Sequence, residues 1–138
     1  MSAGTLAVGC GVAVASLLQG CAAIRYVDGV IDSDKIRVNK NEFIEQHFVI
    51  VTSKDLQAPI YVVKSKEDDT YSAFLMLCTH LNCELRPTGT FLSCPCHGSE
   101  FSNKGEVLQG PASTSLAYYE VVEEEQEIII DLNKLKKS

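Results

Sequence analysis

The sequence predicts an all-β domain, either a small antiparallel sandwich or a barrel. Short runs rich in Val, Ile, Tyr, Phe and Thr recur from about Asp32 onward, and turn residues separate them. In the run Leu116–Val122 the odd positions are apolar, which is the alternation that a half-buried strand requires. Only Asn41–Gln46 has a pattern compatible with a helical turn. Many short strands joined by loops are typical of a closed or sandwiched sheet.

Each expected strand is a run of β-branched or aromatic residues that ends at a turn signal. The breaks include Glu67-Asp68-Asp69, Pro87-Thr88-Gly89, Asn103-Lys104-Gly105 and Gly110-Pro111. In chain order the expected strands are Lys35–Val38, His47–Thr52, Pro59–Lys66, Thr70–Leu77, Thr90–Leu92, Glu106–Leu108, Leu116–Val122 and Glu127–Leu132. The basic residues that follow, Lys134–Lys137, are expected to form a solvated tail.

Length and charge limit the classes of protein to consider. A chain of 138 residues is long enough for one domain with a sizeable core. Its 46% hydrophobic and 22% charged residues exclude an intrinsically disordered chain. With 12 basic and 18 acidic residues the net charge is −6, so no nucleic-acid partner is expected, because phosphates are bound by clusters of Lys and Arg.

The N-terminal stretch from Ser2 to Ile24 carries no charged side chain. It is long enough to span a bilayer, and it equally suits the apolar part of an export signal. It contains Leu18-Gln19-Gly20-Cys21, which resembles a bacterial lipoprotein cleavage box except at Gln19; if the box is used, Cys21 is lipidated. We therefore expect a signal or membrane anchor over residues 1–24, a hinge over 25–34 and a folded domain over 35–138.

Two cysteine- and histidine-rich segments carry the chemistry. They are Cys78-Thr79-His80-Leu81-Asn82-Cys83 and, ten residues later, Cys94-Pro95-Cys96-His97-Gly98-Ser99. Thiolates and imidazoles that converge from two loops indicate a transition-metal site. A structural zinc, two disulfides and an iron–sulfur cluster of mixed ligation all remain open on these residues. Each segment offers one Cys and one His as a pair, which suits two metals better than one.

The double motif resembles the signature of the Rieske [2Fe–2S] proteins, specifically the high-potential, disulfide-containing branch of cytochrome bc complexes. Glu100-Phe101, Gly105-Glu106-Val107 and Gly110-Pro111-Ala112 are also similar to that family, and the resemblance covers roughly residues 35–132. It implies a Rieske-type antiparallel β sandwich or barrel with a small cluster-binding subdomain, here preceded by the membrane-anchoring segment. It also implies one [2Fe–2S] cluster per subunit.

The resemblance assigns a role to each residue of the motif. It implies Cys78 and Cys94 on the inner iron, His80 and His97 on the outer iron, a disulfide between Cys83 and Cys96, a hydroxyl hydrogen bond from Ser99 to a cluster sulfur, and Pro111 in a loop that covers the cluster. Neutral imidazoles in place of two thiolates make the cluster easier to reduce. A disulfide requires an oxidising compartment, which agrees with an export leader.

Two positions depart from the family pattern. Asn82 stands where members often carry Gly, and Asn is the least costly substitute where φ is positive. Phe101 stands where the highest-potential members carry a Tyr whose hydroxyl bonds a ligand sulfur. Phe cannot make that bond, so we expect a lower potential, which suits a low-potential quinol such as menaquinol.

The function implied is one-electron transfer from quinol, at a cytochrome b-type subunit, to a c-type cytochrome. The domain would lie on the periplasmic or extracytoplasmic side of a membrane, as an electron-transfer subunit rather than an enzyme alone. Three alternatives stay open: the small Rieske subunit of an exported molybdenum oxidoreductase of the arsenite oxidase type, a soluble ferredoxin-like donor to an oxygenase, and a zinc-stabilised module.

Overall fold

The computed structural model describes residues 23–137, and within them the chain forms strands and one short 3₁₀ helix, η1 (Lys40–Phe43). A larger sheet holds β1 (Tyr26–Asp28), β2 (Ile31–Asp32), β3 (Lys35–Asn39), β4 (Phe48–Thr52), β5 (Ile60–Lys64), β6 (Tyr71–Leu75), β11 (Tyr118–Glu123) and β12 (Glu127–Lys136). A smaller sheet holds β7 (Arg86–Pro87), β8 (Phe91–Ser93), β9 (Glu100–Ser102) and β10 (Val107–Gln109). The all-β prediction is confirmed.

The expected anchor over residues 1–24 and the lipidation of Cys21 fall on the part of the chain that the structure leaves undescribed, apart from residues 23 and 24. Among residues 23–137 no helix has the length and apolar character that crossing a bilayer requires.

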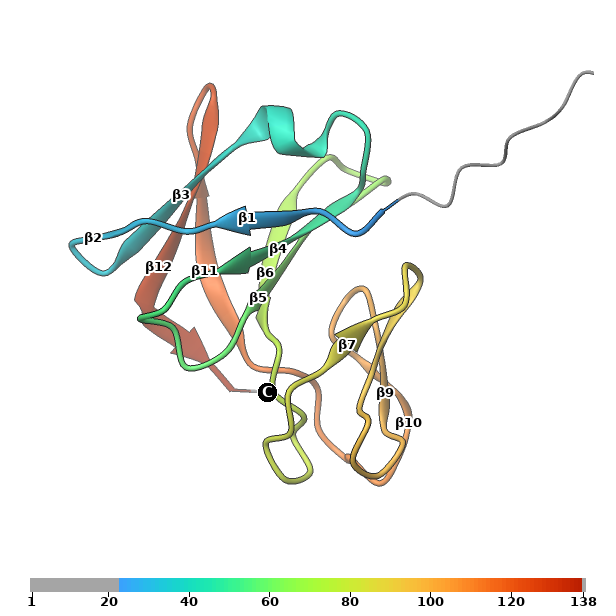
Figure 1. Cartoon of the computed structure of the whole chain (residues 1–138). Coiled ribbons are helices and arrows are strands. Elements are labelled where there is room, and N and C mark those ends of the chain that lie inside the picture. The colour runs from blue at the N-terminus through green and yellow to red at the C-terminus, as the bar shows by residue number, and fades with distance from the viewer. Residues whose placement is uncertain (1–22, 138) are drawn as a thin grey trace, which may run out of the picture.

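The larger sheet curls until its two edges meet (Figure 1). Its strand order is β1-β4-β5-β6-β11-β12-β3-β2, yet only Gly29 and Val30 separate β1 from β2. The Gly29 N–H donates to the Thr52 carbonyl at 2.7 Å, and a Cβ on Gly29 would lie 2.8 Å from a Val51 methyl group. The same Cβ would lie 3.2 Å from a methyl group of Ile36. The space between β4 and β3 at this position therefore has no room for a side chain.

The hinge expected over residues 25–34 is wrong for most of that segment, because β1 and β2 belong to the sheet. β1 pairs in parallel with β4, and β2 pairs antiparallel with β3. Ser33 and Asp34, both with positive φ, form the two-residue turn between β2 and β3, as in the tight turns that suit hairpins. The strands were missed because each is only two or three residues long and gains its stability from its neighbours.

Strand β5 is buried on both of its faces, and this feature creates two cores. Ile60 and Val62 point into the barrel, where they join a cluster that contains Ile36 and other strand residues. Tyr61 and Val63 point the opposite way and pack with residues that support the smaller sheet. The second core also contains Met76, Cys78, Leu85, Leu92, Cys94, Phe101 and Leu116. The two cysteine- and histidine-rich segments therefore pack, through Cys78 and Cys94, directly against the outer face of β5.

The smaller sheet is an insertion between two adjacent strands of the larger one (Figure 1). β6 and β11 pair antiparallel, with Phe74 opposite Tyr118 and Ala73 opposite Tyr119. Between them the chain leaves the barrel, forms β7 to β10 and returns. Both cysteine- and histidine-rich segments lie in this excursion, which matches the expected small subdomain.

The C-terminal tail expected over Lys134–Lys137 is also wrong in part. β12 continues through Lys136, which lies opposite Tyr118 in the register. The Lys134 ammonium lies 2.8 Å from a Glu120 carboxylate oxygen across the strand pair. Charged side chains are common on the solvent face of a strand, so a basic composition did not indicate a tail.

Gly105 joins the two sheets, and its replacement by Ala is expected to destabilise the fold strongly. Its φ is +75°, and a Cβ there would lie 2.6 Å from the Phe74 ring. Gly89 is a matched control because its φ is +98° but nothing lies within 4 Å of the added Cβ. Gly89→Ala should cost about 1–2 kcal/mol from backbone strain, and Gly105→Ala about 1–3 kcal/mol more from overpacking. Chemical denaturation followed by circular dichroism measures both; equal losses would contradict the Phe74 clash.

Candidate metal centre

Two loops with the same hydrogen-bond pattern face each other at one end of the smaller sheet. We call them the first site loop (residues 78–83) and the second site loop (residues 94–99). In the first, the Cys78 N–H donates to the Cys83 carbonyl at 2.8 Å and the Asn82 N–H to the Cys78 carbonyl at 2.8 Å. In the second, the Cys94 N–H donates to the Ser99 carbonyl at 2.8 Å and the Gly98 N–H to the Cys94 carbonyl at 3.1 Å.

The fifth residue of each loop has a left-handed backbone. The φ of Asn82 is +57° and that of Gly98 is +77°. Asn tolerates this conformation better than other residues with a side chain, because its short polar group does not crowd the backbone. The departure at position 82 therefore preserves the loop geometry.

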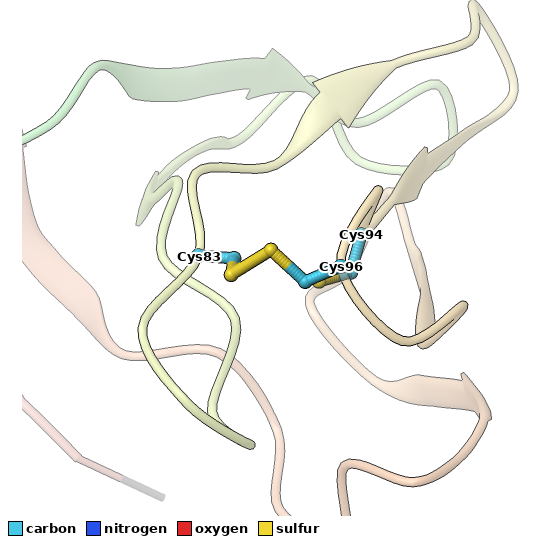
Figure 2. Close-up of side chains that lie close together, drawn as sticks. All are labelled: Cys83, Cys94 and Cys96. Carbon is cyan, nitrogen blue, oxygen red and sulfur yellow. A yellow bond between two sulfur atoms is a disulfide. The ribbon is translucent and has the colours of Figure 1, made fainter.

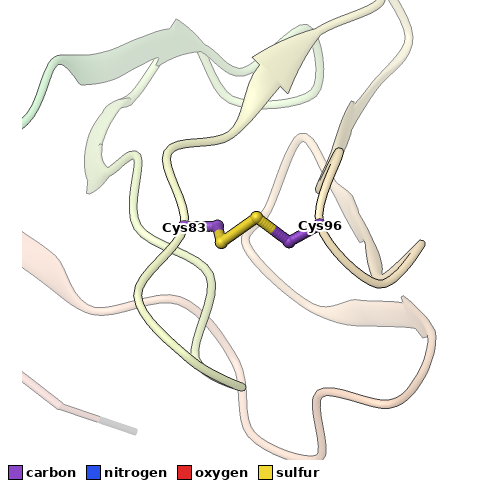
Figure 3. The surroundings of a disulfide bond; sticks show 2 residues. All are labelled: Cys83 and Cys96. Atoms are coloured by element: carbon purple, nitrogen blue, oxygen red, sulfur yellow. A yellow bond between two sulfur atoms is a disulfide. The ribbon is translucent and has the colours of Figure 1, made fainter.

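A disulfide joins the two loops. Cys83 and Cys96 are bonded with a Cα–Cα distance of 6.5 Å and a sequence separation of 13 (Figure 3). The expected pairing is present in the structure. The bridge fixes the distance between the site loops independently of any metal.

The remaining site cysteines are free and buried. Cys78 is 1% exposed and Cys94 2% exposed, and both belong to the same buried cluster. The two histidines of the motifs lie on the outside, where both rings are exposed. The ring centroids of His80 and His97 are 5.0 Å apart and the rings are perpendicular. The possible metal donors thus fall into two groups: two buried thiols and two exposed imidazoles.

The environment of Cys94 favours its ionised form. Burial raises the pKa of this thiol, but hydrogen bonds from the backbone N–H groups of Cys96 and His97 and from the Cys78 thiol outweigh it, so the pKa falls below its usual range. Hydrogen bonds to a thiolate stabilise the charged form. A thiolate is the form of Cys that binds metal.

A second group of sulfur atoms lies at the same place. The sulfurs of Cys83, Cys94 and Cys96 all lie within 4.8 Å of one another (Figure 2). Two of the three form the disulfide, so they are not available as thiolate ligands. Among residues 23–137 the cysteines whose thiols remain free to bind a metal are therefore Cys78 and Cys94.

A third segment, which we call the covering segment (residues 109–114), is hydrogen-bonded to both site loops. The Ala112 N–H donates to the Ser99 hydroxyl oxygen at 3.0 Å, and this serine is fully buried. Because that oxygen accepts, the hydroxyl hydrogen of Ser99 remains available to donate elsewhere. The Gln109 side-chain amide donates to the Gly98 carbonyl at 2.9 Å, and the Thr79 hydroxyl donates to the Thr114 carbonyl at 2.7 Å.

Sequence reasoning did not identify Gln109 or Thr79 as part of the site. Both bonds join residues that lie far apart in the chain, by 11 and 35 positions. Ordinary polar side chains in loops carry no signal of such long-range pairing. Pro111 belongs to the covering segment and is exposed; its expected position over the cluster stays a prediction.

The sequence model of one family, described as the Rieske [2Fe-2S] domain, matches residues 30–120. The chain belongs to the Rieske family. It is 33% identical over 99 residues to the cytochrome b6-f complex iron-sulfur subunit 1 of Nostoc sp., covering 67% of this chain and 55% of that protein. It is 42% identical over 64 residues to the chloroplastic cytochrome b6-f complex iron-sulfur subunit of Pisum sativum, covering 43% of this chain and 27% of that protein.

The chain spans about half the length of the first of these relatives and less of the second. Among solved structures, the plasma membrane Rieske protein PetC3 from Synechocystis PCC 6803 superposes with a TM-score of 0.57 at 26% identity. That superposition covers 67% of this chain and 93% of the other. The Rieske fold expected from the motifs is confirmed.

The donor set of this Rieske domain fits a [2Fe–2S] cluster. Two buried thiols lie together and two imidazoles lie together, and such a division suits one iron held by sulfur and one by nitrogen. A single zinc has no need for that division. A pair of disulfides is excluded because Cys78 and Cys94 are free in the structure.

Proposed function

We propose that Cys78 and Cys94 bind one iron of the cluster as thiolates and that His80 and His97 bind the other through ring nitrogens. The buried positions of the sulfurs and the exposed positions of the rings support this assignment. Ser99 is proposed to donate its free hydroxyl hydrogen to a cluster sulfur, since its oxygen already accepts from Ala112. Such a bond favours added negative charge at the cluster.

The proposed function is one-electron transfer between quinol and a c-type cytochrome. One observation carries it: the perpendicular rings of His80 and His97 reach solvent while both thiols are buried. When bound, the cluster supplies a site that accepts and releases one electron. An exposed ring nitrogen that is neither bound to iron nor protonated can accept a hydrogen bond from a quinol hydroxyl and take up its proton.

The surface beside the histidines suits an apolar partner. Leu81 lies between His80 and Asn82 and is 63% exposed, so a large apolar side chain stands at the surface next to the histidines. A quinol ring or an apolar groove of a partner would cover it. The buried thiols and the covering segment exclude water from the sulfur end of the site at the same time.

We further propose that the chain works in a membrane complex with a cytochrome b-type subunit. The relatives described above are named as subunits of cytochrome b6-f complexes. The disulfide requires an oxidising compartment, so the domain is proposed to lie on the extracytoplasmic side. The uncharged N-terminal stretch would then serve as its anchor, through a spanning helix or a lipidated Cys21.

An electron paramagnetic resonance redox titration of the iron-loaded chain tests the proposed ligation and function together. We expect a rhombic signal in the reduced state, with an average g value below that of the free electron. The midpoint should lie above about −150 mV, within the range of mixed His and Cys ligation. Bound zinc without iron, or a midpoint near about −400 mV as in four-Cys clusters, would overturn the proposal.

Phe101 is proposed to keep the potential below that of Tyr-bearing members and so to suit menaquinol. It is fully buried in the same core as Cys94. Phe101→Tyr is expected to raise the midpoint by roughly 40 mV, because one hydrogen bond contributes about 1 kcal/mol and about 59 mV corresponds to a tenfold change for one electron. Phe91→Tyr, on the neighbouring strand β8, is the control and should leave the midpoint unchanged. A midpoint unmoved by Phe101→Tyr would contradict the proposed tuning.

A further inference from the structure

We propose that a cleft between the barrel and the smaller sheet binds a neutral, single-ring aromatic compound that carries an oxygen substituent, such as an aryl ketone. In this proposal the Tyr61 hydroxyl donates a hydrogen bond to the oxygen of the ligand. None of the residues that line the cleft belongs to the two site loops or to the covering segment. The proposed site is therefore separate from the metal centre and goes beyond electron transfer.

The cleft has the size and the position of a small-molecule site. One wall is the outer face of the barrel, formed by residues of β4, β5 and β6. The opposite wall is formed by residues 89–90, between β7 and β8, and residues 103–104, between β9 and β10. The volume of the cleft is about 520 Å³. Small-molecule sites commonly measure about 300–1,000 Å³ and often lie where two substructures meet.

Tyr61 brings a buried polar group without a partner to this cleft. The residue is 4% exposed and lines the cleft. Within residues 23–137 nothing forms a hydrogen bond with its hydroxyl, yet no fully enclosed side-chain oxygen in that range lacks a partner. The hydroxyl oxygen therefore reaches the open space of the cleft. Burial raises the pKa of Tyr61 to about 12, so the hydroxyl keeps its proton and can donate it to an acceptor.

The wall around this hydroxyl is aromatic. The ring centroid of Phe48 lies 5.1 Å from that of Tyr61, with an angle of 36° between the ring planes. Phe74 lies opposite Tyr61 in the register of β5 and β6, and it also lines the cleft. Aromatic rings pack well against one another in offset or edge-to-face arrangements. The wall thus suits a ring, and the hydroxyl suits an oxygen on that ring.

The charges that line the cleft favour a neutral ligand. The charged residues are three lysines and two carboxylates: Lys64, Lys66, Lys104, Glu67 and Asp68. The Lys64 ammonium is already paired with the Asp69 carboxylate at 3.1 Å. Hydrogen bonds, the largest from the Ser65 hydroxyl, hold the pKa of both Glu67 and Asp68 below the usual range. Two ammonium groups and two carboxylates therefore remain and balance each other.

Fluorine nuclear magnetic resonance titrations of the iron-loaded full chain test the proposal. The probes share one ring: 4-fluoroacetophenone, 4-fluorotoluene and 4-fluorobenzoate. The ketone should bind saturably, and Tyr61→Phe should weaken its binding about fivefold, the usual net effect of one hydrogen bond. The same variant should leave 4-fluorotoluene unaffected, because toluene offers no oxygen. The benzoate should bind more weakly than the ketone, because burial of an unpaired carboxylate is costly. His47 also lines the cleft, so the titrations are run at pH 8, at which histidine is ordinarily uncharged.

Two further variants make the test specific. Tyr119 is the matched control, because it is the other buried tyrosine in residues 23–137 and lies outside the cleft. Tyr119→Phe should leave the affinity for the ketone unchanged. Ser72 lines the cleft, so Ser72→Phe should fill it and weaken both the ketone and the toluene at least about tenfold. The proposal is overturned if the ketone does not saturate, if Tyr61→Phe and Tyr119→Phe weaken it equally, or if the benzoate binds more tightly than the ketone.

Discussion

Serine in place of Cys94 is expected to give a folded chain that holds no iron. Iron should fall from about two atoms per chain to near zero, because a serine hydroxyl does not ionise near neutral pH and is a harder ligand than a thiolate. The barrel should remain, since its interior cluster consists of other residues, among them Ile36, Val62 and Ile130. Iron analysis and far-ultraviolet circular dichroism measure the two effects.

A matched pair of histidine variants makes the experiment specific. His80→Ala should lose the cluster, whereas His47→Ala should keep it. His47 is also exposed, but it precedes β4 and lies outside both site loops. Iron retained in Cys94→Ser, or lost equally in both histidine variants, would show that the ligands lie elsewhere.

Removal of the disulfide by Cys83→Ser together with Cys96→Ser is expected to destabilise the iron-loaded chain by about 3 kcal/mol, the value for a closed loop of this length. The thermal midpoint should fall by roughly 10–15 °C, given about 3–5 °C per kcal/mol for a chain of this size. The cause is the freedom that the unfolded chain regains when the two loops are no longer joined. Iron should still bind, because neither cysteine is a proposed ligand.

A reductant provides the internal control for this second prediction. Reduction of the Cys83–Cys96 disulfide in the native chain should lower its thermal midpoint toward that of the double variant. The double variant itself should not respond to the reductant. A variant that loses its iron along with its stability would mean that the bridge positions the ligands rather than merely joining the loops.

Local pattern was sufficient for the long strands of the fold and for the short strands β8 and β10, but not for β1, β2, β7 and β9. The alternation of Ala117, Tyr119 and Val121 predicted a half-buried strand, and all three side chains contact the barrel core. β7 and β9 were missed because neither is a run of β-branched or aromatic residues: β7 is Arg86–Pro87, and Phe101 is the one such residue in β9. Glu100–Ser102 becomes β9 only because β8 and β10 pair with it on either side.

The bridge between Cys83 and Cys96 could be predicted from the sequence, for a physical reason. Cys and His have few roles other than metal binding, disulfides and catalysis, so their spacing is informative. The bonds from Gln109 and Thr79 to the opposite loops could not be predicted, because they depend on how the covering segment folds back over the site. The predicted extent of the hinge was wrong for a similar reason. β1 is a strand because it pairs in parallel with β4, and this pairing arises only when the barrel closes.

The insertion of the smaller sheet between β6 and β11 makes the metal-binding layer a transplantable module. The chain leaves the barrel at the end of β6 and returns at the start of β11, and these two strands are antiparallel neighbours. A short hairpin turn in place of the inserted segment would therefore leave the barrel topology intact. A metal-free scaffold could be engineered in that way once Tyr61 and Val63, which the module covers, are made polar. The same two junctions define where the module could be grafted onto another antiparallel pair.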